Sequence, residues 1–305
     1  MLKRWRAEPA PAYGGGGSTA PAADRHRHRT RVIEPSRRHT PRLREIWIHR
    51  RLIGYFGFIF VERRYRRTWL GWLWIPLRPA VDIGGRVLFF GGFLSVSPGD
   101  RPYFMFFIVG SAAWQLVFVG SLWATRSVDI NRMLFSRINL PRGTAVAAAI
   151  VPGLLDFLIY ASIGLAGVAY YYVKTGRFYL TLGPTTVFAG LGLGLLCVWV
   201  FSIGLWLSPL AARARDVRFL LGYVFSFWYL VTPVIYPTSF LPMKYRPIAE
   251  YNPLTAPVEF VKYGLLGTSP PTHGSIISSL VALTLVLVGG LYIFNRSEHA
   301  ASARV

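Results

Sequence analysis

The sequence predicts an all-α integral membrane protein with six transmembrane helices, an N-terminal amphipathic helix at the membrane interface, and short re-entrant helices between spans five and six. Composition is the first reason, because 53% of the 305 residues are hydrophobic and only 15% are charged, unlike a soluble domain. The second reason is that six segments are long and apolar enough to cross a bilayer. The third is that positive charge gathers in alternate loops between these segments.

The N-terminal region, residues 1–44, is predicted to be a disordered, basic cytoplasmic tail. It contains a run of four glycines, several prolines and the stretch RHRHRTR, and it has too little apolar surface to offset the entropy lost on ordering. The net charge of +21 is concentrated near this end, since 17 of the 34 Lys and Arg residues lie within the first 67 positions. A nucleic-acid-binding protein is disfavoured, because that function would not explain the apolar segments that follow.

Residues 45–67 are predicted to form the amphipathic helix in the headgroup plane. Aromatic and aliphatic residues are interleaved with arginines here, which suits a helix with its apolar side in the bilayer and its arginines at lipid phosphates. A seventh span is the competing interpretation. Only about ten consecutive residues are uncharged, however, which is too few for a hydrocarbon core of about 30 Å at about 1.5 Å per residue.

The transmembrane domain is predicted over residues 68–296, followed by a short cytoplasmic tail at 297–305. The loops near 125–143 and 212–218 carry seven arginines, whereas the loops near 95–102 and 174–182 carry three Lys and Arg residues in total. Cytoplasmic loops are enriched in Lys and Arg, so both termini are predicted to be cytoplasmic. The six spans are expected at roughly 69–94, 103–124, 145–173, 183–211, 219–240 and 275–294.

The connection between the fifth and sixth spans is about 34 residues long and too apolar for a solvated loop. Four prolines, Pro242, Pro247, Pro253 and Pro257, interrupt it too often for a continuous span. Short helices that dip into the outer leaflet are expected, because irregular backbone is tolerated at that depth where protein or a cavity satisfies it.

Ionisable residues inside predicted spans are candidate functional residues, because a charge within the membrane is costly. Arg78, Asp82 and Arg86 follow at i, i+4 steps in the first span, so Asp82 can pair with either arginine. This stripe either faces an aqueous or substrate-filled path or forms an ion ladder that fixes helix packing, and the sequence leaves both open. Asp156 in the third span has no local partner, and an interhelical hydrogen bond is preferred to a transport role.

No catalytic residues, metal site or cofactor are predicted on this chain. No Ser, His and carboxylate occur at a catalytic spacing, and the N-terminal histidines lack Cys or carboxylate residues at ligand spacing. A Walker-type nucleotide site is excluded because none of the four lysines follows a glycine. Gly190, Gly192 and Gly194 imitate part of a dinucleotide fingerprint, but they lie within an uncharged span and predict close helix packing instead.

Four motifs occur in order within residues 42–296: YRRTWLGWLWIPLRP from position 65, NRMLFSRINLPR at 131–142, ARDVRFLLGYVFSFWYLVTPVIYP at 214–237 and YNPLTAPVEF at 251–260. Together with six spans they resemble the permease subunits of ABC-2 type transporters, in the branch that exports lipid-linked polysaccharides such as O-antigen lipopolysaccharide, capsule and teichoic acid. The chain departs from that pattern at Asp82 and Arg86, where an apolar first span is usual, and at Leu140, where Phe is common.

The resemblance implies a transport subunit rather than an enzyme. It implies a homodimer of permeases in the cytoplasmic membrane of a bacterium, paired with two copies of a separate ATPase that holds ATP and Mg. The lipid headgroup of the substrate would enter near a turn at Leu70 and Gly71. Contacts with the ATPase would involve Asn131, Leu134, Arg137, Pro141, Arg215 and Asp216, and an outer gate would involve Asn252 and Pro253.

A glycan on a polyprenyl (pyro)phosphate has an anionic junction between an oily tail and a hydrated sugar chain, and the residue chemistry agrees with this cargo. The guanidinium group suits phosphate oxygens, which makes Arg63, Arg64, Arg66, Arg67 and Arg78 candidates for the headgroup. Aromatic faces suit the C–H faces of sugar rings. The candidate path residues are Trp72, Trp74, Asp82, Arg86, Trp114, Phe225, Trp228 and Tyr229. Interfacial anchoring is the alternative role for the arginines and the aromatic residues.

The leading hypothesis is therefore export of a lipid-linked glycan, driven by ATP hydrolysis on partner chains. Three alternatives stay open: an ABC-2 exporter of a drug or lipid, a polytopic membrane enzyme that modifies glycans or lipids, and a channel or secondary carrier that uses the Arg78, Asp82 and Arg86 stripe. The sequence identifies neither the glycan nor whether its chain is completed before export.

Overall fold

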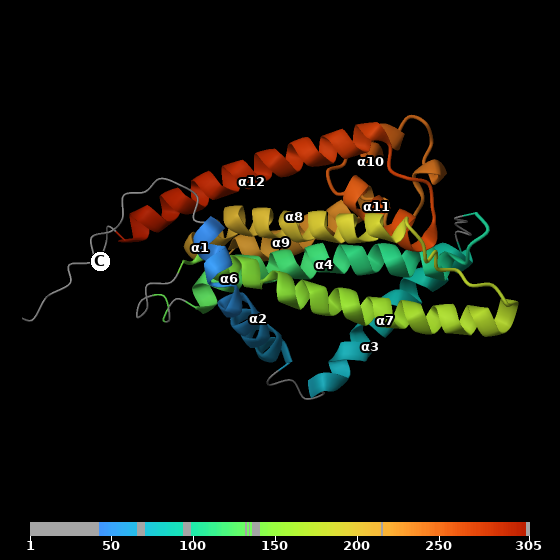
Figure 1. Cartoon of the computed structure of the whole chain (residues 1–305), viewed down its shortest axis with the longest axis horizontal. Helices are drawn as coiled ribbons and strands as arrows, with labels where there is room; N and C mark the ends of the chain where they lie inside the picture. Colours follow the sequence, from blue (N-terminus) through green and yellow to red (C-terminus); the bar gives the residue numbers. More distant parts are fainter. Residues whose placement is uncertain are drawn as a thin grey trace, which may run out of the picture. The chain divides into compact units, whose positions relative to one another are not determined.

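The computed structural model describes residues 43–65, 71–93, 99–131, 133, 135, 141–214 and 216–302, and every regular element among them is a helix (Figure 1). The all-α fold class is therefore confirmed for this part of the chain. The predicted N-terminal tail lies outside the described residues except for its last two positions.

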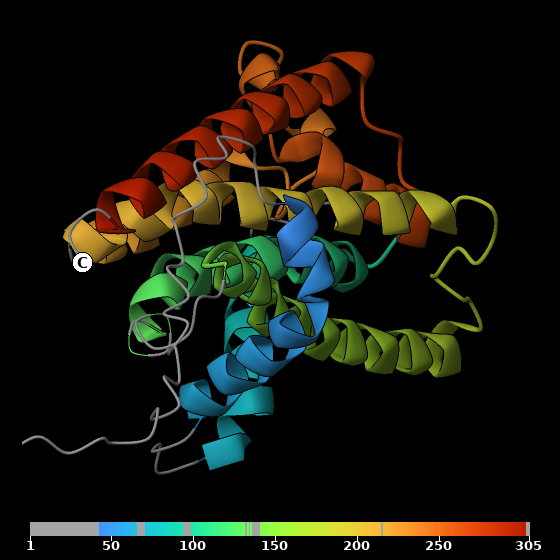
Figure 2. The same cartoon turned by 60° about the vertical axis from the view of Figure 1, so that its left-hand side comes forward.

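The centre of the fold is α4 (Tyr103–Ile130), which is buried along most of its length. It lies between α7 (Ile150–Thr175) and α8 (Thr186–Arg213), and both views show this arrangement (Figures 1 and 2). Small residues allow the close approach. A Cβ atom on Gly153 of α7 would lie 2.5 Å from the Leu116 carbonyl oxygen of α4. Packing of small residues is how transmembrane helices associate without a hydrophobic driving force between them.

Of the three glycines predicted to support close packing in α8, only Gly192 does so. A Cβ atom on Gly192 would lie 2.6 Å from the Pro257 carbonyl oxygen of α11 (Thr255–Leu266), whereas Gly190 and Gly194 have no neighbour within 4 Å. The helical period explains the difference, because residues i and i+4 share one face and residue i+2 points away from it. The prediction is therefore confirmed for Gly192, and within the described part of this chain Gly190 and Gly194 show no close packing.

Four helices are long and apolar enough to cross a membrane among the described residues. They are Tyr103–Ile130, Gly143–Thr175, Thr186–Arg213 and His273–Ser297, and they coincide with predicted spans two, three, four and six. The third combines the short α6 (Gly143–Ala148) with α7. The last belongs to α12 (His273–Ser302), which continues as a helix into the predicted C-terminal tail. In Figure 1, α12 runs along α8, where the Trp206 indole of α8 donates to the Val286 carbonyl oxygen at 2.6 Å.

Predicted spans one and five correspond to shorter or more polar helices. Span one is η1 (Gly71–Leu73), α3 (Trp74–Arg86) and a π-helical segment, η2 (Val87–Phe93). Span five is α9 (Asp216–Val231), which has 16 residues. Their crossing of the membrane stays a prediction. The π-helical segment η2 directly follows Arg86, and π-helical turns are frequent at functional sites.

The segment after α9 forms short helices, as its prolines predict. These are η3 (Thr238–Phe240), α10 (Arg246–Glu250) and α11, which ends at Gly267 with a left-handed φ of 62°. Their depth in the outer leaflet stays a prediction.

The predicted interfacial helix consists of α1 (Leu43–Ile48) and α2 (Arg50–Tyr65). Its aromatic residues divide between two environments, which the amphipathic pattern did not show. Phe56 and Phe60 are fully buried in a cluster with α6 and the end of α12, whereas Tyr55 and Phe58 are exposed. The helix is therefore docked on the helical bundle by part of its apolar surface, and only the remainder is free to face lipid.

Candidate functional site

Two cavities flank α4 near the first predicted span. The first, which we call the arginine cavity, has a volume of about 390 Å³. It is lined by Arg64, Trp74, Ile75, Arg78, Pro79, Gln115, Asp156, Ile159 and Tyr160. The second, which we call the aromatic cavity, has a volume of about 260 Å³. It is lined by Arg86, Phe90, Trp114, Gln115, Phe118, Phe225, Ser226, Tyr229, Leu230 and Ile235. Gln115 of α4 lines both cavities and so separates them.

In the arginine cavity, Arg64 of α2 forms a two-point ion pair with Asp156 of α7. The two guanidinium nitrogens lie 2.6 and 2.9 Å from the two carboxylate oxygens. The interhelical hydrogen bond expected for Asp156 is thus present, and Arg64 is its partner. Arg64 was predicted as a headgroup residue, and it lines the arginine cavity.

Arg78 provides the second cation of this cavity. It is exposed, and it forms no ion pair with any residue that the structure describes. Asp82 instead pairs with Arg86 at 2.8 Å, which decides between the two i, i+4 partners that the sequence allowed. An arginine without a carboxylate partner keeps its donors available for an anionic ligand such as phosphate.

A chain of polar contacts runs between the two cavities. The Gln115 amide nitrogen donates to the Tyr160 hydroxyl at 3.0 Å, and that hydroxyl donates to Asp82 at 3.0 Å. Asp82 holds Arg86, whose guanidinium carbon lies 4.5 Å from the centre of the Tyr229 ring. The stripe of Arg78, Asp82 and Arg86 therefore has two roles. Its contacts connect α3 with α4, α7 and α9, and its side chains supply polar groups to the walls of both cavities.

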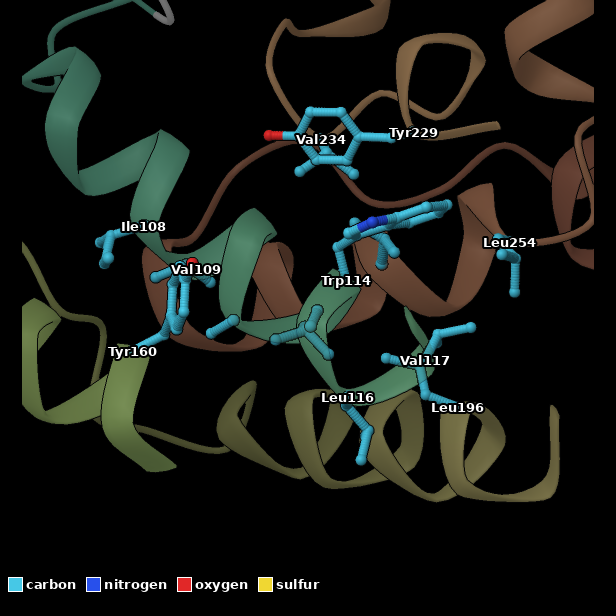
Figure 3. Close-up of a cluster of buried hydrophobic side chains, with 14 of the residues drawn as sticks. Ile108, Val109, Trp114, Leu116, Val117, Tyr160, Leu196, Tyr229, Val234 and Leu254 are labelled. Carbon is cyan, nitrogen blue, oxygen red and sulfur yellow. The ribbon is translucent and has the colours of Figure 1, made fainter. Parts of the chain in front are cut away.

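The aromatic cavity contains four of the predicted path residues, which are Arg86 and three aromatic residues. The Trp114 ring centre lies 6.1 Å from that of Phe225 and 5.4 Å from that of Tyr229. Figure 3 shows Trp114 and Tyr229 close together, with Tyr160 on the other side of α4. The fourth aromatic residue, Trp228, stacks on Phe225 at 5.8 Å. The sequence could identify these residues as aromatic, but only the packing of α4 against α9 gathers them.

The remaining predicted headgroup and path residues are distributed unevenly. Trp74 lines the arginine cavity, and Arg63 is exposed near the end of α2. Gly71 adopts a left-handed φ of 49°, which favours glycine and is consistent with the predicted turn. Arg66, Arg67, Leu70 and the side chain of Trp72 lie outside the described residues.

Some predicted coupling residues are structural anchors. Asn131 is buried, and its amide donates back to the Ser127 carbonyl oxygen at 2.9 Å at the end of α4. The Pro141 carbonyl oxygen accepts from the Thr144 hydroxyl at 2.7 Å at the start of α6. Asp216 is the first residue of α9. Leu134, Arg137 and Arg215 lie outside the described residues.

Sequence reasoning missed an ion pair beside these residues. Arg218 of α9 donates to Asp129 of α4 at 2.7 Å and to the Ala211 carbonyl oxygen of α8 at 3.4 Å. One arginine therefore joins the two loop regions that the resemblance assigns to ATPase contact. The signal was hidden because the two charged residues are 89 positions apart in the sequence.

The predicted outer gate residue Asn252 is buried and connects α9 to the segment that follows it. Its side-chain oxygen accepts from the Trp228 indole at 2.8 Å, and its amide nitrogen donates to the Thr232 hydroxyl at 2.8 Å. Pro253 is half-buried next to it. These contacts fix the end of α9, so a movement of α9 would reach this segment directly.

The described residues contain no group of three or more His, Cys, Asp and Glu side chains that could hold a metal ion.

Comparison with known proteins finds relatives over most of the chain. O-antigen export system permease protein RfbA of Myxococcus xanthus is 25% identical over 198 residues, which cover 65% of this chain and 72% of that protein. A protein of the same name from Klebsiella pneumoniae is 22% identical over 238 residues, which cover 77% of this chain and 88% of that protein. No protein-family model matches the chain. The matches extend far beyond the four short motifs, and they confirm that the chain resembles the permease proteins of O-antigen export systems.

Proposed function

We propose that this chain is the transmembrane permease subunit of an ABC exporter that moves a lipid-linked polysaccharide of the O-antigen type across the cytoplasmic membrane. The observation that carries the proposal is the pairing of the arginine cavity with the aromatic cavity across Gln115, in a chain similar to O-antigen export permeases. The two cavities match the two chemistries of such a cargo, whose anionic lipid phosphate is joined to a sugar chain.

In this proposal the arginine cavity receives the (pyro)phosphate. Arg78 has no ion-pair partner among the described residues, and Arg64 is held in place by Asp156 with its charge offset. A phosphate bound between two guanidinium groups forms charge-assisted hydrogen bonds that are about twice as strong as neutral ones. Asp156 balances the charge of Arg64, so the empty cavity keeps only the charge of Arg78 uncompensated, which lowers the cost of placing two arginines at membrane depth.

The aromatic cavity then contacts the first sugars. Trp114, Phe225 and Tyr229 present ring faces, and Arg86, Gln115 and Ser226 supply polar groups. Such walls give weak, repeated contacts, which suit a polymer that has to keep moving.

Energy for export comes from a separate ATPase in this proposal. Two permease copies and two ATPase copies form the complex, as the sequence resemblance implies, and both termini of this chain are cytoplasmic. The ion pair between Asp129 and Arg218 supports the proposal, because it links the two loop regions expected to contact the ATPase.

The test is surface glycan display in a bacterium whose own copy is deleted and replaced by variants. Arg78→Gln removes the unpaired cation and keeps a polar side chain of similar length. We expect it to lower glycan display by roughly tenfold, because a charge-assisted hydrogen bond to phosphate is lost. Arg177→Gln is the control, since this arginine is exposed in the loop between α7 and α8 and lines neither cavity.

Normal glycan display by Arg78→Gln, with normal protein level in the membrane, would contradict the headgroup role. Stimulation of the complex's ATPase by drugs or free lipids, and not by polyprenyl-linked sugars, would favour the exporter of a smaller cargo. Activity of this chain without an ATPase would favour a membrane enzyme, and dependence on a proton gradient would favour a secondary carrier.

A further inference from the structure

A third cavity, which we call the outer polar cavity, lies at the end of α4 opposite Asp129. Its volume is about 260 Å³, and it shares no lining residue with the arginine cavity or the aromatic cavity. The charge pattern of the loops predicts that this end is outside the cell. The walls contain Arg101, Thr238, Ser239, Glu259, Lys262 and Ser269, which come from the loop before α4, the segment after α9, and α11 with the loop that follows it.

Lys262 is at the base of this cavity and is 2% exposed. Its ammonium group donates to the carbonyl oxygens of Pro233 and Val234, at 2.5 and 3.1 Å, where the chain leaves α9. It also lies 3.7 Å from the centre of the Phe106 ring. An ammonium group has three donors, and no carboxylate forms an ion pair with Lys262 among the described residues. Burying an ammonium group without a carboxylate partner costs free energy, and here two carbonyl oxygens and the Phe106 ring surround the charge instead.

Glu259 lies one helical turn before Lys262 and also lines the cavity. One of its carboxylate oxygens accepts from the Thr238 hydroxyl at 3.3 Å, and no other described residue donates to the carboxylate. Burial raises the pKa of Glu259 and lowers that of Lys262. Around them, the hydroxyls of Ser239 and Ser269 form no hydrogen bond with any other described residue, and both residues are exposed at the rim.

The mixture of groups selects a class of ligand. A simple anion is disfavoured by Glu259, and a simple cation is disfavoured by Lys262 and Arg101. A sugar has hydroxyls that each donate and accept, so it can donate to the carboxylate and accept from Arg101 in one place. The volume is slightly below the range of about 300–1,000 Å³ typical of small-molecule sites, which allows a single ring.

We propose that the outer polar cavity binds one neutral sugar residue, with Glu259 accepting hydrogen bonds from its hydroxyls and Arg101 donating to its oxygens. The inference that this sugar belongs to the glycan leaving the cell rests on the proposed function. The cavity would then be a contact for the polymer outside the membrane, next to the segment that Asn252 ties to α9.

The test uses the full chain, purified without sugar-containing detergent and reconstituted in nanodiscs, with saturation-transfer NMR as the measurement. The probes are D-glucose, D-galactose, D-mannose, L-rhamnose and N-acetyl-D-glucosamine, and empty nanodiscs give the background. We expect saturation transfer to at least one probe. Glu259→Gln should weaken that binding by about tenfold, because the amide loses a charged acceptor. Ser269→Trp places a bulky ring at the exposed rim and should abolish it.

The matched control is Asp100→Asn, which neutralises an exposed carboxyl group next to Arg101 that does not line the cavity. It should bind like the unmodified chain. Saturation transfer to none of the five sugars, or equal transfer with Glu259→Gln and Ser269→Trp, would overturn the proposal. If the chain binds sugar but exports no glycan, the proposed function is contradicted and the cavity assignment stands. If the chain exports glycan but binds no sugar, the cavity assignment is contradicted and the proposed function stands.

Discussion

Arg64 and Asp156 are 92 positions apart in the sequence and meet at the wall of the arginine cavity. Their side chains are 14% and 9% exposed, so the pair is largely shielded from water. For such a pair, removal of one partner leaves a buried charge, whereas removal of both does not. The pair therefore stabilises the docking of α2 on α7 and at the same time sets the charge of the cavity.

We predict that Asp156→Asn lowers the free energy of unfolding by about 3 kcal/mol, because Arg64 loses its counter-ion. The combined Arg64→Gln, Asp156→Asn variant should lose less than the sum of the two single variants. The loss of stability is measured by thermal unfolding in detergent, in which the amount of monodisperse protein is recorded as the temperature rises. Arg63→Gln is the control, since the adjacent arginine is exposed. Additive losses from the two single variants would show that the pair is not coupled.

The pH dependence of stability should report on Glu259. Burial raises its pKa to about 7, despite the nearby Lys262 ammonium and the Thr238 hydroxyl, and the Glu250 carboxyl adds to the rise. Arg101 also faces the carboxyl group across the outer polar cavity. Because the folded pKa lies above the ordinary value, the folded state binds the proton more tightly, and this group's contribution to stability decreases as pH rises from about 4.5 to about 7.

We therefore predict that Glu259→Gln, which cannot ionise, gains thermal stability relative to the unmodified chain as pH rises from 5 to 8. The measurement is the difference in Tm between the two proteins at each pH. The Glu259 carboxylate raises the pKa of Lys262, so Glu259→Gln lowers that pKa further, and the resulting change in stability with rising pH has the same sign. A Tm difference that is constant or decreases over this range would contradict the prediction, and Asp100→Asn should show no such trend.

At the level of elements, one arginine connects three helices on the side predicted to be cytoplasmic. Arg218 at the start of α9 contacts Asp129 at the end of α4 and the last turn of α8. At the other end of α9, Trp228 and Thr232 are bonded to Asn252. Since α9 also provides Phe225 and Tyr229 to the aromatic cavity, a displacement at its Arg218 end would reach both the cavity and the segment that holds Asn252.

We predict that Asp129→Arg and Arg218→Asp each lower the glycan exported per ATP hydrolysed by roughly fivefold, equivalent to about 1 kcal/mol of coupling free energy. The variant with both changes restores the ion pair with reversed charges and should recover most of the loss. Arg126→Asp is the control, because Arg126 is exposed one turn before Asp129. No recovery in the charge-exchanged variant would show that the ion pair itself is not required. The association of the ATPase is measured in parallel, to separate assembly from coupling.

At the scale of the whole chain, the positive charge of the loops predicts a membrane orientation. Four apolar helices coincide with predicted spans, while α3 with η2 and α9 have the polar residues or the shorter length expected of helices that line a path. A six-span topology requires all of them to cross, with the α7–α8 loop outside and the α8–α9 loop inside.

Cysteine labelling tests this topology, because Cys197 is the chain's only cysteine and can be replaced. In a Cys197→Ala background we predict that Arg177→Cys, between α7 and α8, reacts with a membrane-impermeant maleimide in intact cells. Ala212→Cys, near the end of α8, should react only after the membrane is permeabilised. Both positions are exposed, so a difference between them reports the side of the membrane. The reverse pattern would invert the predicted orientation.

Prediction from sequence was most successful where a property is local. Continuous apolar length identified α4, α7, α8 and α12, and the i, i+4 spacing limited the partners of Asp82 to Arg78 and Arg86, of which the structure shows Arg86. It was less successful for α2, where a single amphipathic face was expected and two environments are present. Helical periodicity reports that a face is apolar, and it does not distinguish a neighbouring helix from lipid.

The sequence by itself determined the class of protein, its apolar helices, the gathering of arginines before the first span and the resemblance to polysaccharide-export permeases. These properties depend on composition and short spacings, which can be determined from the sequence without knowing the fold. Only the tertiary structure decided that Asp156 holds Arg64, that Gln115 separates two cavities, and that Lys262 and Glu259 share a third. Each of these depends on how elements distant in the sequence pack against one another, and the free energy of packing depends on the whole arrangement rather than on local sequence.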